Sequence, residues 1–150
     1  MNPQEHPYGQ SAMLALHYAR SVAYAVKDPY IRTDHLLAGL IRTRSSTTTL
    51  IRMRTPPGAI RPLMGDLGRY APSDRELDEH AVAAAELHPT PALLRVQKKY
   101  AHVMAAVASR EEIDTDCLLG GILLNEESLG CQILHRAGAN LRKYFAALEV

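Results

Sequence analysis

Apolar residues recur every three or four positions along most of this chain, which is the spacing that places them on one face of an α-helix. The first such stretch covers 10–26, and its apolar stripe consists of Leu14, Tyr18, Val22 and Val26, widened by Ala15, Ala19 and Ala23. Pro29 ends this helix at the preceding residue, because proline disfavours helical geometry there.

Further helices are predicted from the same spacing, and they cover 33–42, 48–54, 60–70, 92–109, 115–124, 127–137 and 141–148. In 92–109 the expected apolar face consists of Leu93, Val96, Tyr100, Met104 and Val107. Thr33 and Thr115 are placed to cap their helices, with Asp34 and Asp116 in the first turn against the positive helix end. No segment alternates strictly between apolar and polar residues, so no sheet is expected.

Part of the sequence occurs twice. Residues 31–41 return as 113–123, an offset of 82 positions, and the same offset carries 14–23 onto 96–105. One offset held over about thirty residues indicates a duplicated structural unit. We therefore expect one all-α domain of about eight helices, built as two four-helix repeats with pseudo-twofold symmetry. Repeat one covers about 9–70, a connector about 71–89, and repeat two about 90–150; Ser73 and Glu76 predict a short helix in the connector.

The composition favours helices, and the overall charge does not indicate a polyanion as partner. Hydrophobic residues make up 47% of the 150 residues, mostly good helix formers, with no Trp and one Phe. The net charge is +1, yet 32–69 holds seven Arg and two acids, whereas 74–86 holds five acids and one Arg. We interpret these stretches as solvated faces. Nucleic-acid binding is not expected, because the basic stretch lacks interleaved aromatic residues.

No motif for catalysis is found. Cys117 and Cys131 lie in apolar stretches and read as small buried hydrophobes, and the seven histidines show no metal-ligand spacing. His35 is matched by Cys117 in the other copy, which favours a packed or capping role. No phosphate loop or nucleophile motif occurs. We expect no enzyme activity, no metal and no cofactor, and a cytoplasmic protein without membrane partners, since no signal peptide or membrane span is apparent.

The repeated motif resembles a known one. Residues 30–41, Tyr-Ile-Arg-Thr-Asp-His-Leu-Leu-Ala-Gly-Leu-Ile, are similar to Tyr-Ile-Gly-Thr-Glu-His-Ile-Leu-Leu-Gly-Leu-Ile of ClpC-like proteins, and 134–141 resembles their Leu-x-x-x-Gly-x-x-Leu element. With the duplication, the chain resembles the N-terminal domain (Clp-N repeat) of the Clp unfoldases over roughly 10–148, without the ATPase modules.

The resemblance implies a docking platform for adaptor proteins and substrate segments. In ClpC-like members each repeat also holds phosphoarginine: the acid of the motif faces the guanidinium, and the start of the repeat's first helix helps to hold the phosphate. Carried onto this chain, the candidate ligand-binding residues are Thr33, Asp34, Thr90, Thr115 and Asp116.

Several residues depart from the family pattern. Both motif acids are shortened from Glu to Asp, and Tyr8-Gly9 stands where the family has Phe-Thr at the first repeat's start. Arg32 is placed to pair with Asp34 and so to compete with an incoming guanidinium. The second copy is therefore expected to be the more competent site.

Two functions remain open. The chain is either a docking module that brings adaptors or substrates, arginine-phosphorylated ones included, to a Clp protease machine, or a free-standing decoy that sequesters peptide ligands of the unfoldase. A Clp ATPase and cyclic peptide inhibitors are among the partners that this resemblance implies.

Overall fold

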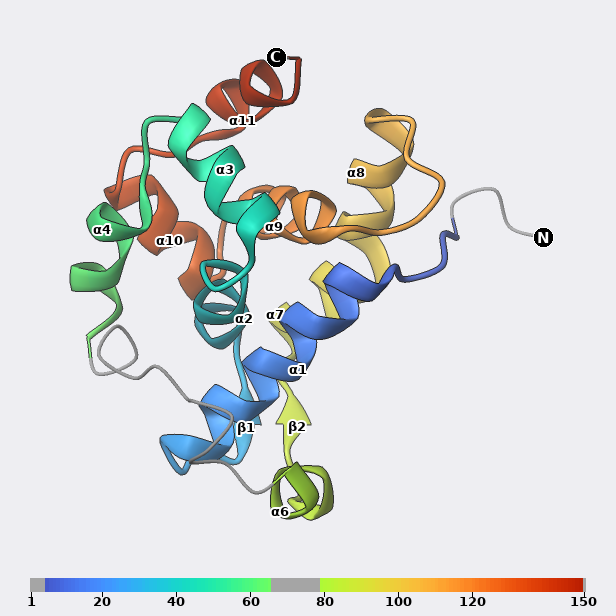
Figure 1. Ribbon diagram of the computed structural model, residues 1–150, viewed down its shortest axis with the longest axis vertical. Coiled ribbons are helices and arrows are strands. Elements are labelled where there is room, and N and C mark those ends of the chain that lie inside the picture. Colours follow the sequence, from blue (N-terminus) through green and yellow to red (C-terminus); the bar gives the residue numbers. More distant parts are fainter. Residues whose placement is uncertain (1–4, 66–78, 150) are drawn as a thin grey trace.

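The computed structural model describes residues 5–65 and 79–149. Helices account for nearly all of its regular structure, which confirms the all-α fold (Figure 1). The first repeat consists of α1 (Gln10–Ala25), α2 (Thr33–Leu40), α3 (Arg44–Arg52) and α4 (Pro57–Ile60), which continues as the 3-10 helix η1 (Arg61–Met64). After α6 (Glu79–Ala84), the second repeat consists of one long helix, formed by α7 (Pro91–Arg95), η2 (Val96–Tyr100) and α8 (Ala101–Val107), then α9 (Thr115–Leu124), α10 (Leu129–Arg136) and α11 (Leu141–Leu148).

Two predicted boundaries need correction. The third helix begins at Arg44 rather than at residue 48, so its threonines are tolerated within a helix. The predicted helix over 60–70 is instead the end of a short helical segment that stops at Met64. The remainder of that prediction, and the Ser73–Glu76 capping box, lie outside the described residues.

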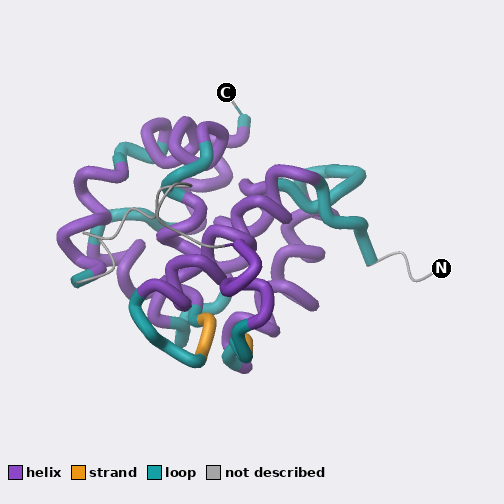
Figure 2. The backbone as a smooth tube through the Cα atoms, turned by 60° about the horizontal axis from the view of Figure 1, so that its bottom comes forward, coloured by secondary structure: helices purple, strands orange, loops and turns teal. Residues whose placement is uncertain are grey.

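The expectation of no strand was wrong at one point. Strand β1 (Tyr30–Ile31) pairs in parallel with β2 (His88–Pro89). These strands are the two short orange segments in Figure 2. A second pairing, an isolated bridge, joins Tyr8 to Ile113. Two-residue strands are too short to produce an alternating pattern, so the sequence carries no signal for them.

The two pairings are related by an exchange of the repeats. The Thr90 N–H donates to the Ile31 carbonyl at 3.0 Å, and the Gly9 N–H donates to the Ile113 carbonyl at 2.9 Å. In each case the residue before one repeat's first helix bonds to the residue two positions before the other repeat's second helix. A twofold relation between the repeats requires this reciprocity, and the two bonds tie the start of each repeat to the other repeat.

The helix ends are duplicated as well. Lys27 and Ser109, which are 82 positions apart, both have positive φ (59° and 54°) after the first helix of their repeat. Arg54 and Gly138 do the same after α3 and α10, with φ of 59° and 97°. The following amides, of Thr55 and Ala139, both donate at 2.9 Å to the carbonyl five residues earlier. The first repeat thus keeps the left-handed conformation at this helix end, where glycine is the usual residue, although Arg54 occupies the position.

The two first helices differ by one residue. In η2 the Ala101 N–H donates to the Val96 carbonyl, a five-residue step that accommodates one extra residue in the helix. Before this π turn the buried Leu93 and Val96 correspond to Ala12 and Ala15 at an offset of 81. After it, buried positions correspond at an offset of 82. The match of Leu14 with Val96 was therefore wrong.

The buried face of α1 includes Val22 and the alanines of the predicted stripe, Ala15, Ala19 and Ala23, but not its larger residues Leu14 and Tyr18. Leu14 is 44% exposed, and Tyr18 is only half-buried. Close packing against α2 explains this, because a Cβ added to Gly39 would lie 2.5 Å from the Ala15 carbonyl oxygen. In the second copy Val107 is 60% exposed, contrary to prediction.

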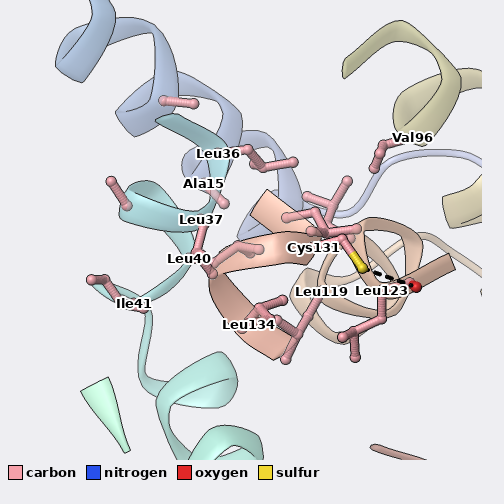
Figure 3. Close-up of a cluster of buried hydrophobic side chains, with 14 of the residues drawn as sticks. Ala15, Leu36, Leu37, Leu40, Ile41, Val96, Leu119, Leu123, Cys131 and Leu134 are labelled. Atoms are coloured by element: carbon pink, nitrogen blue, oxygen red, sulfur yellow. Dashed lines mark hydrogen bonds between the residues drawn. The ribbon is translucent and has the colours of Figure 1, made fainter. Parts of the chain in front are cut away.

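The core lies between α2 and α9, whose residues are almost all buried (Figure 3). Its largest members include Leu36, Leu37, Leu40, Leu118, Leu119, Ile122 and Leu134. Cys117 and Cys131 are buried in it, as predicted, and burial raises the pKa of their thiols to about 12 and about 11. The Cys131 thiol donates to the Leu123 carbonyl at 3.5 Å. Helices α2 and α9 are buried on nearly all sides, as expected for helices at the centre of a domain.

Candidate functional site

The two predicted capping threonines occupy the first helical position and do not cap. The N-cap is the residue before each threonine. The Asp114 carboxylate caps α9 by accepting the Cys117 N–H at 2.9 Å, whereas the Arg32 side chain makes no capping hydrogen bond to α2. Instead, Thr33 Oγ1 accepts the Gly130 N–H at 2.9 Å, and Thr115 Oγ1 shares a hydrogen bond of 2.5 Å with Ser45 Oγ. Each threonine thus fastens its helix to the third helix of the other repeat.

His35 is fully buried and has a capping role, in agreement with the sequence. Its Nδ1 accepts the Arg32 N–H at 2.9 Å. Its Nε2 has no hydrogen-bond partner among the described residues and lies 3.9 Å from a carboxylate oxygen of Asp28. Burial lowers the pKa of His35, so the neutral ring is the form that fits the fold.

In the first copy the motif acid already has a guanidinium partner. Arg32 holds Asp34 in a bidentate pair, with Nε 3.0 Å from Oδ1 and Nη2 3.1 Å from Oδ2, and also pairs with Asp28. Asp34 is 3% exposed, and its hydrogen bond is the main reason that the pKa of Arg32 is raised. A pocket of about 470 Å³ lies beside this pair. The pairing of Arg32 with Asp34 that the sequence predicted is therefore present.

In the second copy the motif acid is partly open. The Asp116 side chain is 16% exposed, and its Oδ1 accepts the Thr49 hydroxyl at 2.7 Å. Arg110 pairs mainly with Asp114 at 3.0 Å and lies 3.9 Å from Asp116. Burial raises the pKa of Asp116, and the charge of Asp114 adds to this effect. Asp116 thus lacks the bidentate guanidinium partner that Asp34 has.

Asp116 lines a pocket of about 660 Å³ at the boundary between the repeats, which we call the arginine pocket. Helix α1, the loop after α2 and helix α3 supply its other walls. The full lining is Ser11, Leu14, Tyr18, Arg42, Thr43, Arg44, Ser45, Thr48, Thr49, Arg52 and Asp116. The Arg42 guanidinium lies over the Tyr18 ring at 4.7 Å. Three cations and one carboxylate make this pocket suited to ligands that carry negative charge.

The arginines of this pocket were missed by sequence reasoning. Their signal was the basic stretch 32–69, which we interpreted as a solvated face. That stretch also supplies Arg32, Arg54 and Arg61, which do not line the pocket. Only the fold shows which of its members converge.

Thr90 lies apart from Asp116. It caps α7, accepting the Leu93 N–H at 3.2 Å, and its own N–H bonds to Ile31 beside the start of α2. The neighbouring Ala92 carbonyl accepts from Asn125, beyond the far end of α9. Asn125 lies nine positions after Asp116, or about 14 Å along α9 at the usual rise per residue. The structure therefore groups Thr90 with Thr33 and Asp34, whereas Gly9 bonds to Ile113, in the segment that leads to Thr115 and Asp116.

Neither a metal cluster nor a membrane-spanning helix is found in the described part of the chain. Within 5–65 and 79–149, no cluster of His, Cys, Asp and Glu could hold a metal ion. None of the helices formed by these residues has the length and apolar character needed to cross a membrane.

Comparison with known proteins gives matches in structure but not in sequence. No family model and no curated protein sequence matches the chain. A chain from a malarial protein secretion system is similar with a TM-score of 0.74 and 15% identity, covering 95% of this chain and 92% of that chain. The N-terminal domain of Hsp104 from Candida albicans is similar with a TM-score of 0.69 and 16% identity, covering 95% of this chain and 89% of that chain.

A third match comes from a plant chaperone. The N-terminal domain of the caseinolytic protease associated chaperone ClpD from Arabidopsis thaliana has a TM-score of 0.61 and 19% identity, covering 95% of this chain and 94% of that chain. All three matches span nearly the whole of both chains. The chain therefore has a Clp-N-like fold, the fold of the N-terminal domains of Hsp104 and ClpD.

Proposed function

We propose that this chain is a non-catalytic docking module that binds segments of adaptor or substrate proteins for a Clp-type unfoldase. The observation that carries the proposal is the arginine pocket, an open hollow between the two repeats of a Clp-N-like fold. Pockets of this size that combine apolar walls with a few placed polar groups are typical of ligand sites. A protein segment is the ligand class that the chaperone domains of this fold suggest.

Phosphoarginine is the specific modification that we propose for this site. Its guanidinium would face the Asp116 carboxylate, and its phosphoryl group would face Arg44 and Arg52, which are exposed. Charge-assisted bonds of both kinds are the strong ones in proteins. The Asp34 site is disfavoured, because an incoming guanidinium would have to displace Arg32 from its bidentate pair.

Calorimetric titration with phosphoarginine tests this proposal, with an unmodified arginine peptide as the control ligand. Asp116→Ala should weaken phosphoarginine binding by about 1–3 kcal/mol, the worth of a hydrogen bond to a charged group. Asp34→Ala should leave the affinity nearly unchanged, because Asp34 is already occupied. Equal losses in the two variants, or no heat at all with the parent chain, would remove phosphoarginine from the proposal.

A further inference from the structure

We propose that the arginine pocket selects acidic peptide segments, in which carboxylate side chains flank an apolar one. This inference rests on the proposed docking function and adds a preference for charge. It concerns unmodified glutamate and aspartate side chains, which need the arginines of the pocket and do not need Asp116.

The charge of the pocket supports this preference. Arg44 and Arg52 are exposed on α3 and form no ion pair with another residue in the described part of the chain. Arg42 lies over Tyr18, so three guanidinium groups surround one hollow. The opposing charge is the single carboxylate of Asp116, which already accepts a hydrogen bond from Thr49. Guanidinium groups bind carboxylates in a bidentate fork, so acidic side chains complement these walls.

The fold itself does not require Arg42 and Arg44. The N-caps Thr43 and Ser128 begin the third helix of each repeat, and so define equivalent positions. Where the first repeat has Arg42 before its cap, the second has Glu127. The residues just after the two caps, Arg44 and Leu129, differ in the same way. The second repeat folds without a cation at either of these two positions, so the placement of Arg42 and Arg44 around one hollow points to a ligand.

The apolar wall favours a peptide over a nucleic acid. Leu14 is 44% exposed and lines the pocket beside the half-buried Tyr18. A peptide can place an apolar side chain against Leu14 while its neighbours reach the arginines. A phosphate backbone gains little from Leu14, and the one aromatic ring in the lining is covered by Arg42. Single-stranded nucleic acids are usually held on open aromatic platforms in a basic groove.

Fluorescence anisotropy with a labelled peptide of alternating glutamates and leucines tests the inference. The control peptide replaces every glutamate with glutamine. Arg44→Glu should weaken binding of the acidic peptide about tenfold, the loss expected for one charge-assisted pair. This variant should fold normally, because Arg44 is the first residue of α3, where an acid favours the helix dipole. Arg95→Glu, an exposed change on α7 away from the pocket lining, is the matched charge control and should have little effect.

Asp116→Asn separates this preference from phosphoarginine binding. Asparagine keeps the oxygen that accepts from Thr49 and removes the negative charge, so acidic peptide should bind more tightly and phosphoarginine less tightly. Equal affinity for the glutamate and glutamine peptides, or equal losses in Arg44→Glu and Arg95→Glu, would overturn the inference while leaving docking intact. An RNA oligonucleotide that binds more tightly than the acidic peptide, with the same dependence on Arg44, would also overturn it. Failure of every peptide to bind would overturn the proposed function as well.

Discussion

Leu118 is a core residue on the buried helix α9, and truncating it measures how much its side chain contributes to stability. Its side chain is 0% exposed. Leu118→Ala removes three carbon atoms, worth about 0.8 kcal/mol each or about 2.4 kcal/mol in transfer free energy. The cavity left behind adds to this, so we expect a loss of about 3–5 kcal/mol. For a domain of this size, such a loss lowers the melting temperature by roughly 6–20 °C.

Urea unfolding followed by circular dichroism measures this loss, and Val107→Ala is the matched control. Val107 is 60% exposed on α8, so its truncation should change the unfolding free energy by less than about 0.5 kcal/mol. The contrast tests the helix faces that the structure assigns, since the sequence alone placed Val107 on the buried face. Similar losses from both variants would show that these faces are wrongly assigned.

Two further predictions concern the first repeat. Gly39→Ala should destabilise the fold by about 1–3 kcal/mol, because its Cβ would meet the Ala15 backbone. Gly58→Ala has nothing within 4 Å of the new Cβ and should be neutral or slightly stabilising. Thermal melts compare the two variants. Since burial lowers the pKa of His35 in the fold, stability should fall as the pH drops from the ordinary value of 6.5 towards the folded value. His35→Gln keeps an acceptor for the Arg32 N–H and should make this decline in stability shallower. Urea melts at several pH values measure the decline. An unchanged decline in the variant would show that His35 is not its source.

The sequence predicted the helices and the duplication well, because both depend on the apolar pattern that burial imposes. The repeated segment 31–41 and 113–123 does enclose the core, and both cysteines are buried there. The π turn could not be predicted because one extra residue in a helix leaves a similar apolar spacing on either side. With the repeats aligned across this turn, Leu14 no longer matches the buried Val96, and it lies on the wall of the arginine pocket.

Details that depend on long-range contacts could not be predicted. Thr33 and Thr115 look like caps in the sequence, yet their hydroxyl groups bond across the repeats to Gly130 and Ser45. The sequence also placed Thr90 and Asp116 in one site, because both belong to the second repeat. The structure separates them, because the segment that leads into each repeat bonds to the other repeat. A pocket shared between repeats leaves no local motif, so its arginines could be recognised only once α3 was placed beside α9.

The location of peptide binding is the central question, and amide chemical-shift mapping by NMR answers it most directly. Titration of the labelled chain with the acidic peptide should perturb the amides of the arginine pocket, on the first half of α1, along α3 and at Asp116. The start of α2 around Asp34 should change little, because the cation there, Arg32, is already paired with Asp28 and Asp34. Perturbations centred instead on α8, near the exposed Val103 and Val107, would contradict the assignment of docking to the boundary between the repeats.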